Sequence, residues 1–233
     1  MEEFVGVTAP LYEELAFSGK NILIAGMTGS GKSTIMNGLI NSILYEDNAN
    51  HQIILVDLKR VEFSKYKDTA HCLGFAKTLE EAETTLNYVK TTINIRLDDM
   101  ERRGLDKWDG MTLHLFVDEM AELMLGNKKV ANQLQSICQI GRAAGVQVVV
   151  ATQCPLAEVI PTRIKVNFPI IIGLHTALAQ HSRNILEVNG CEDLPLHGEA
   201  LIMRPDCTIT RTQVPMIPED MLFKIIELNR RVA

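Results

Sequence analysis

The sequence has no long uninterrupted hydrophobic run, and this absence argues against a membrane-spanning helix. No apolar run approaches the roughly 18 residues that such a helix requires. The first ten residues, MEEFVGVTAP, are acidic and lack the basic segment and apolar core of a secretory signal. We therefore expect a cytoplasmic protein that does not insert directly into a membrane.

Cysteine is scarce, and its spacing shows no pairs. The five cysteines are odd in number, and none lies in a CxxC arrangement. This favours free thiols over a disulfide framework. The sequence also lacks Pro/Gly-rich linkers, low-complexity stretches and internal repeats, so 233 residues favour a single globular domain.

Positive charge is not in excess. The 23 Lys and Arg residues against 29 Asp and Glu residues give a formal net charge of −6. A protein that coats itself in nucleic acid usually has a basic footprint, so broad nucleic-acid binding over the whole surface is not expected.

Short apolar runs rich in β-branched residues recur along the chain, as expected for strands buried on both faces. Five such runs are NILIAG (21–26), QIILVD (52–57), LHLFVDE (113–119), VQVVVAT (146–152) and FPIIIGL (168–174). Apolar residues spaced by three and four within residues 78–104 predict one long amphipathic helix closed by Gly104. Strands alternating with helices predict an α/β fold with a mostly parallel central sheet flanked by helices.

Three further segments complete the expected fold near the carboxyl end. EALIMRP (199–205) and TITRTQV (208–214) predict two closing strands, and residues 218–231 predict a final helix. Nothing in the composition indicates a second domain.

A glycine-rich segment, IAGMTGSGKST, occupies residues 24–34. Gly26, followed after four residues by Gly31, Lys32 and Ser33, fits the pattern GxxxxGK[ST], and it stands between a predicted strand and a predicted helix. Glycines let backbone N–H groups surround a phosphate, Lys32 neutralises the outer phosphates, and the Ser33 hydroxyl ligates Mg²⁺. The segment therefore predicts a site for a nucleoside triphosphate, ATP, with Mg²⁺.

Two acidic residues follow the apolar run at residues 113–117. Asp118 is placed to hold Mg²⁺ through water, and Glu119 to orient and deprotonate the attacking water. Gln153 closes another run and is placed to sense the γ-phosphate; an exposed acidic turn and a polar strand end are the structural alternatives. The predicted nucleotide-binding residues are Gly26, Met27, Thr28, Gly29, Ser30, Gly31, Lys32, Ser33, Thr34 and Asp118, with Ser33 and Asp118 as metal ligands. The predicted catalytic residues from these motifs are Glu119, Lys32 and Gln153.

Eight segments occur in an order and spacing that resemble one known family. They are IAGMTGSGKS, VDLKRVEFSKY, MERRG, FVDEMAELM, GRAAGVQVVVATQ, IKVNFP, HSRNILE and HGEALIM. From about Leu23 to Val214 they resemble the motor domain of FtsK/SpoIIIE-type DNA translocases. The resemblance implies a RecA-like P-loop NTPase fold, a hexameric ring with ATP between subunits, and double-stranded DNA in the pore. It divides the chain into an N-terminal segment, residues 1–18, and a motor domain, residues 19–233.

The resemblance also implies roles for two arginines. Arg142 in GRAAG and Arg183 in HSRNIL match family arginines, and a ring needs an arginine that reaches the neighbour's γ-phosphate. We expect Arg142 to act in this way ahead of Arg183, and a surface cation or structural ion pair is the alternative for each. Lys59 and Glu62 match a stretch close to the site in related motors, and a structural pairing of the two is equally open.

The sequence departs from the family pattern at two places. Cys154 stands where members usually have arginine, and the stretch at residues 168–172 lacks another usual arginine. The motifs end shortly before the end of the chain, so we expect a core motor without the flanking domains of the translocases. Any function of those two arginines is therefore in doubt for this chain.

Two classes of function remain open from the sequence. The first is an ATPase that pumps duplex DNA in chromosome partition, conjugative transfer or a similar process. The second is a protein-export motor of the type VII secretion kind, which shares this domain. A degenerate regulatory copy is disfavoured by the intact Lys32, Asp118 and Glu119.

Two short basic segments are the candidate pore loops for DNA. They are GNKKV, with Lys128 and Lys129, and PTRIK, with Arg163 and Lys165. A channel lined by six copies needs only a few phosphate-neutralising cations per subunit, so the net negative charge does not exclude DNA.

Overall fold

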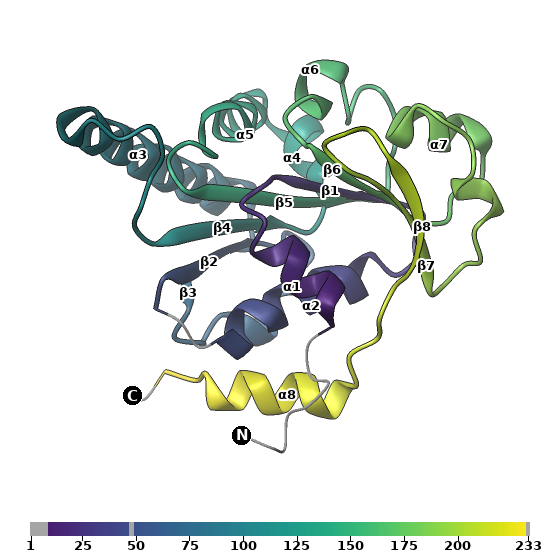
Figure 1. Cartoon of the computed structure of the whole chain (residues 1–233), viewed down its shortest axis with the longest axis horizontal. Coiled ribbons are helices and arrows are strands. Elements are labelled where there is room, and N and C mark those ends of the chain that lie inside the picture. The colour runs from purple at the N-terminus through teal and green to yellow at the C-terminus, as the bar shows by residue number, and fades with distance from the viewer. Residues whose placement is uncertain (1–8, 47–48, 232–233) are drawn as a thin grey trace.

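The central element is one eight-stranded sheet, in the order β3-β2-β4-β5-β1-β6-β7-β8 (Figure 1). The computed structural model describes residues 9–46 and 49–231. The strands are β1 (Ile22–Ala25), β2 (His51–Val56), β3 (Cys72–Ala76), β4 (Thr112–Val117), β5 (Val146–Thr152), β6 (Ile170–Gly173), β7 (Glu199–Met203) and β8 (Ile209–Gln213). Neighbouring strands from β3 to β6 pair in parallel, and β7 and β8 add an antiparallel edge. The prediction of a mostly parallel sheet with two closing strands is confirmed.

Helices cover both faces of the sheet. They are α1 (Pro10–Ala16), α2 (Lys32–Glu46), α3 (Leu79–Arg103), α4 (Met120–Gly126), α5 (Lys128–Ile140), α6 (Thr162–Lys165), α7 (Ala179–Leu186) and α8 (Glu219–Leu228), with 3-10 turns η2 (Ser64–Tyr66) and η3 (Cys191–Asp193). Figure 1 shows α1, α2 and α8 on one face and α3 to α7 on the other. No helix within the described residues is long and apolar enough to cross a membrane.

The central strands are buried on both faces because each face packs under a helical layer. Every residue of β5 is buried. Val148 and Val150 belong to the core under α3 and α5, whereas Val149 and Ala151 belong to the core under α2. Successive side chains of a strand point to opposite faces, so a continuous apolar run supplies both cores.

The long helix α3 has the ends that its sequence predicts. Thr78 is the N-cap, and its side chain accepts a hydrogen bond from the backbone N–H of Glu81. Gly104 ends the helix in the left-handed conformation, with φ at 65°. A glycine adopts this conformation without a Cβ clash, which explains why the helix stops there.

The amino-terminal helix α1 packs directly on α2. Tyr12 is fully buried, and its hydroxyl donates a hydrogen bond to the backbone carbonyl of Pro215. A Cβ at Gly38 of α2 would lie 2.4 Å from the Tyr12 ring, so glycine is needed for this close approach. Residues 1–8 of the proposed N-terminal segment lie outside the described residues, and the boundary at residue 18 remains a prediction.

The expectation that two basic segments form loops is wrong. Lys128 and Lys129 form the first turn of α5, and Arg163 and Lys165 lie in the short helix α6. Asn127 explains the first case, because its side chain accepts hydrogen bonds from the N–H groups of Lys129 and Val130 and so starts a helix.

Candidate nucleotide-binding site

The glycine-rich segment forms the turn between β1 and α2. Gly29 and Gly31 have φ values of 79° and 102°, which non-glycine residues rarely adopt. A Cβ at Gly26 would lie 2.7 Å from both Leu174 Cβ and Ser30 Oγ. These glycines therefore permit a turn that brings the backbone of residues 26–31 around the start of the helix.

Lys32 folds back over this turn. Its ammonium group donates hydrogen bonds to the carbonyl oxygens of Gly26, at 3.0 Å, and Met27, at 2.7 Å. The side chain is buried, and burial lowers its pKa from the ordinary value, while the negative charges of Glu119 and Asp118 act in the opposite direction. Lys32 is thus a buried cation beside two acids.

The turn contains polar groups that are available to bind a phosphate. The Ser30 hydroxyl is buried, and its oxygen has no hydrogen-bond partner among the described residues. The first turn of α2 contains no acidic residue that would repel an anion. A helix amino terminus with free donors and a nearby lysine matches the chemistry of a phosphate, so the residues present fit a nucleotide.

Asp118 follows β4 directly and lies among other acids. Its pKa is raised to about 7, first by burial and then by the negative charges of Glu62 and Asp57. Within residues 9–46 and 49–231, no group of three or more His, Cys, Asp and Glu side chains is arranged to hold a metal ion. Mg²⁺ commonly uses one or two protein oxygens together with phosphate oxygens, and Ser33 and Asp118 fit that role.

Glu119 is buried and held from several directions. Its carboxylate accepts hydrogen bonds from the Thr152 hydroxyl at 2.7 Å, the Gln153 N–H at 3.1 Å and the Ala121 N–H at 3.2 Å. The Lys59 ammonium lies 3.8 Å from its Oε2 atom. The acid that we predicted as the general base therefore has a fixed position, and it is not an exposed acidic turn.

Lys59 takes partners other than the one proposed from the sequence. Besides Glu119, it lies 3.7 Å from Glu122 Oε1. The ion pairs of Lys59 in the structure are therefore with Glu119, the N-cap of α4, and with Glu122 of α4, in place of the pairing with Glu62.

Gln153 reaches across to the phosphate turn. The Thr28 hydroxyl donates a hydrogen bond to Gln153 Oε1 over 2.6 Å. Because β5 lies beside β1 in the sheet, its carboxyl end meets the turn that follows β1. The structure thus brings Lys32, Asp118, Glu119 and Gln153 to one edge of the sheet.

Two residues at this edge were missed from the sequence. Thr152 is fully buried, and it accepts a hydrogen bond from the Cys154 N–H while donating to Glu119. Asp57 accepts hydrogen bonds from the N–H groups of Arg60, Glu62 and Phe63, and so shapes the loop that carries Lys59. Each of these two residues is the last residue of an apolar run. That position is the sequence pattern from which they could have been predicted.

Of the two candidate arginines, Arg142 lies apart from these residues. Arg142 is exposed in the turn before β5, whereas Gln153 follows the other end of that seven-residue strand. At about 3.3 Å per residue the two ends are ~20 Å apart. Arg183 is exposed on α7 and donates hydrogen bonds to Asn189 and Gln180.

Comparison with known proteins shows similarity to one family. Residues 3–115 match the model of the FtsK/SpoIIIE family. The DNA translocase FtsK of Helicobacter pylori strain J99 is 31% identical over 226 residues, which cover 89% of this chain and 26% of the relative. Other curated FtsK translocases, including that of Treponema pallidum at 33% identity, are similar over comparable lengths.

Solved structures share the fold at lower identity. The pCW3 conjugation coupling protein TcpA, solved with ATPγS, has a TM-score of 0.80 and 24% identity, covering 91% of this chain and 65% of TcpA. The type VII secretion ATPase EccC of Thermomonospora curvata has a TM-score of 0.76 and 20% identity, covering 90% of this chain and 28% of that chain.

The chain spans about a quarter of the length of the curated relatives, 26% for the Helicobacter pylori protein. The matches to the Helicobacter pylori and Treponema pallidum relatives nevertheless cover 89% and 88% of this chain. With its eight-stranded, mostly parallel sheet, the chain has a RecA-like P-loop fold, and its sequence is similar to the FtsK/SpoIIIE family.

Proposed function

We propose that the chain is the ATP-hydrolysing motor domain of a ring that translocates double-stranded DNA. The observation that carries this proposal is the meeting of Lys32, Asp118 and Glu119 at one edge of the sheet, with Glu119 held by hydrogen bonds. A lysine for phosphate, an acid for metal and a fixed acid for water are the parts that NTP hydrolysis requires.

Each side chain then has a distinct task. Lys32 moves from its loop carbonyls to the outer phosphates, because a phosphate oxygen is a stronger acceptor than a backbone carbonyl. Glu119 orients the attacking water and accepts its proton. Gln153, already bonded to Thr28 of the turn, responds to the γ-phosphate.

Mg²⁺ would neutralise charge on the phosphates, and Ser33 and Asp118 are the proposed ligands. A carboxylate must be deprotonated to bind a metal. Since the pKa of Asp118 is about 7 in this structure, arrival of a cation favours release of its proton.

Assembly as a hexameric ring is supported by the position of Arg142. Arg142 lies at the opposite end of β5 from Gln153, so it cannot reach the phosphate turn of its own subunit. An arginine that stabilises γ-phosphate charge must then come from a neighbouring subunit. We propose Arg142 for this role, with Arg183 as the second candidate.

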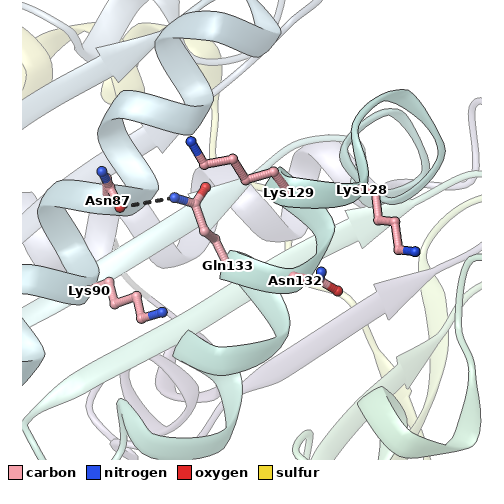
Figure 2. A pocket seen from close by; sticks show the side chains of 6 residues that line it. All are labelled: Asn87, Lys90, Lys128, Lys129, Asn132 and Gln133. Carbon is pink, nitrogen blue, oxygen red and sulfur yellow. Dashed lines mark hydrogen bonds between the residues drawn. The ribbon is translucent and has the colours of Figure 1, made fainter.

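Duplex DNA as the cargo is supported by the names of the curated relatives, which are DNA translocases. Lysine side chains provide candidate phosphate contacts beside a surface groove between α3 and α5 (Figure 2). Lys128 is exposed, whereas Lys129 already pairs with Glu83 at 2.6 Å and Lys165 with Glu187 at 2.8 Å. Lys128 and the exposed Arg163 are therefore the cations best placed to contact a phosphate backbone.

A protein-export motor is the second candidate. The observation that favours it is the similarity of the fold to the type VII secretion ATPase EccC and to EssC of Geobacillus thermodenitrificans, with TM-scores of 0.76 and 0.79. Both kinds of motor would use the same nucleotide site, so only the cargo separates them. We further propose a cytoplasmic location, because all five cysteines are free thiols.

The experiment that tests the nucleotide chemistry compares two variants by ATP binding and ATP turnover. Lys32→Ala should lose both, because the phosphate charge is left uncompensated. Glu119→Gln should keep binding and hydrolyse at least ~100-fold more slowly, the scale expected for loss of a general base. Turnover by Glu119→Gln at the wild-type rate would contradict the assignment of the base.

A further inference from the structure

A second lysine stands beside the proposed general base. The Lys59 ammonium lies 3.8 Å from Glu119 Oε2 and 3.7 Å from Glu122 Oε1, so it forms two ion pairs but is beyond hydrogen-bond distance of either acid. Its side chain is 40% exposed, whereas that of Glu119 is 7% exposed. Lys59 is therefore a solvent-accessible cation that two acids share and neither holds closely.

The two oxygens of Glu119 differ in the donors that they have. Oε1 accepts hydrogen bonds from the Thr152 hydroxyl at 2.7 Å and the Ala121 N–H at 3.2 Å. Oε2 accepts a hydrogen bond from the Gln153 N–H at 3.1 Å. A carboxylate oxygen has two lone pairs, so Oε2 keeps one that can accept the proton of a water. This oxygen is also the one beside the Lys59 ammonium.

The backbone that carries Lys59 is fixed in place. Lys59 lies in the turn after β2, where the buried Asp57 carboxylate accepts three hydrogen bonds from backbone N–H groups. Arg60 has a φ of 62°, a value that a residue other than glycine adopts only where its surroundings impose it. Because β2 pairs in parallel with β4, this turn lies beside Glu119. Lys59 can therefore reach a ligand by moving its side chain alone.

In the proposed function, the γ-phosphate lies among these groups, because Lys32 binds the outer phosphates and Glu119 activates the water that attacks the γ-phosphorus. Burial is the largest influence on the pKa of Lys32 and on that of Asp118, and the charge of Lys59 acts to lower both values. A phosphate oxygen accepts a charge-assisted hydrogen bond over about 2.7–2.9 Å, which is shorter than either ion pair of Lys59. A γ-phosphate at this place is therefore a stronger partner for Lys59 than Glu119 or Glu122.

We propose that Lys59 binds the γ-phosphate within its own subunit, and that Glu119 and Glu122 hold it until a nucleoside triphosphate arrives. The proposal rests on the proposed function, because Lys32 must first place the phosphates. When Lys59 turns to the γ-phosphate, it leaves Glu119 Oε2 to the attacking water, and its charge then stabilises the negative charge of the transition state. A nucleoside diphosphate lacks the γ-phosphate and leaves Lys59 with the two acids.

The test compares ADP with the non-hydrolysable ATP analogue AMP-PNP, both with Mg²⁺, by isothermal titration calorimetry. Only the analogue has a γ-phosphate. Lys59→Met should weaken AMP-PNP binding about tenfold, the scale for loss of one charge-assisted hydrogen bond, and ADP affinity should stay within twofold of wild type. Lys59→Arg keeps the charge and should recover most of the AMP-PNP affinity. ATP turnover should fall in the Met variant, because the γ-phosphate loses a cation.

Lys77→Met is the matched control, because Lys77 is exposed and follows β3, the strand beside β2, at the same edge of the sheet. It should bind both probes as wild type does. If Lys59 only positions Glu119, Lys59→Met would slow ATP turnover and bind both probes normally, and this result would overturn the proposal. Equal losses for ADP and AMP-PNP would also overturn it. Failure of the wild-type protein to bind either probe would instead overturn the proposed function.

Discussion

The hydroxyl of Thr152 donates a hydrogen bond to Glu119 Oε1 over 2.7 Å, and both side chains are buried. The same hydroxyl accepts a hydrogen bond from the Cys154 N–H, so its single proton is directed at the carboxylate. Thr152 therefore fixes the direction of the proposed general base from the neighbouring strand.

Thr152→Val keeps the shape of the side chain and removes this donor. We expect ATP turnover to fall about tenfold at unchanged ADP affinity, because a catalytic group that loses its orientation slows the chemical step. Steady-state kinetics with ADP calorimetry provide the check. Thr152→Ser restores the hydroxyl and should recover most of the turnover. A Val variant as fast as wild type would mean that Thr152 does not position Glu119.

Mixed assemblies test the proposed arginine in trans. Arg142→Ala and Glu119→Gln subunits should each be nearly inactive alone, since each lacks one half of a shared site. A mixture should regain part of the turnover, because some interfaces combine an intact Glu119 with an intact Arg142. The measurement is ATP turnover against mixing ratio. Absence of recovery, together with a specific activity that does not change with protein concentration, would argue against shared sites.

His114 makes stability depend on pH at the opposite edge of the sheet. Its Nδ1 atom lies 2.7 Å from Gln147 Oε1, and its Nε2 atom lies 2.9 Å from His51 Nδ1. Gln147 Nε2 donates to the carbonyls of Leu15 and Lys20, so Oε1 accepts from His114. Burial first, and then the charge of His51, lower the pKa of His114 to about 3.

The sign of the pH effect follows from this depressed pKa. Between pH 6.5 and 3 the unfolded chain binds a proton at His114 that the folded chain does not, so stability falls as pH falls through this range. At pH 5 the loss relative to pH 7.5 is ~2 kcal/mol from this residue. Urea denaturation of wild type and His114→Gln at both pH values measures it, and the variant should show the smaller loss. Equal losses would show that His114 titrates normally in the folded state.

Much of the fold could be predicted from periodicity and glycine placement. The helix α3 was predicted because its apolar stripe is long and Gly104 marks its end. The strands β7 and β8 were predicted from two short segments close together in sequence, and the structure pairs them antiparallel. These patterns are local in the sequence. Local patterns predict an element correctly when tertiary packing favours the same conformation.

Other elements were missed because their signals were short or mixed. β3 is an edge strand whose sequence, CLGFA, includes a glycine and the exposed Leu73, so it shows no continuous apolar run. α5 was taken for a loop at its start because Lys128 and Lys129 are charged, although Asn127 is a strong N-cap. α1 is only seven residues long, and it is stabilised by burial of Tyr12 against α2.

In the candidate site, too, some residues could be predicted from the sequence and others could not. Lys32 was predicted from the GxxxxGK[ST] pattern. Asp118, Glu119 and Gln153 were predicted from their positions after strands, which a parallel sheet places at one edge. The role of Thr152 could not be found, because its partner Glu119 lies 33 residues away in sequence and on another strand. Cys154 does not supply the positive charge of the arginine that usually stands at this position. Its backbone N–H donates a hydrogen bond to the Thr152 hydroxyl.

The cargo is the central claim, and ATP turnover with and without linear duplex DNA tests it most directly. The measurement uses rings held together by crosslinking, so that weak assembly does not hide an effect. We predict that duplex DNA raises turnover without sequence preference, that added salt weakens the effect, and that Glu119→Gln rings do not respond. Rings that hydrolyse ATP but ignore duplex DNA, and are stimulated instead by a candidate secreted protein, would contradict the account.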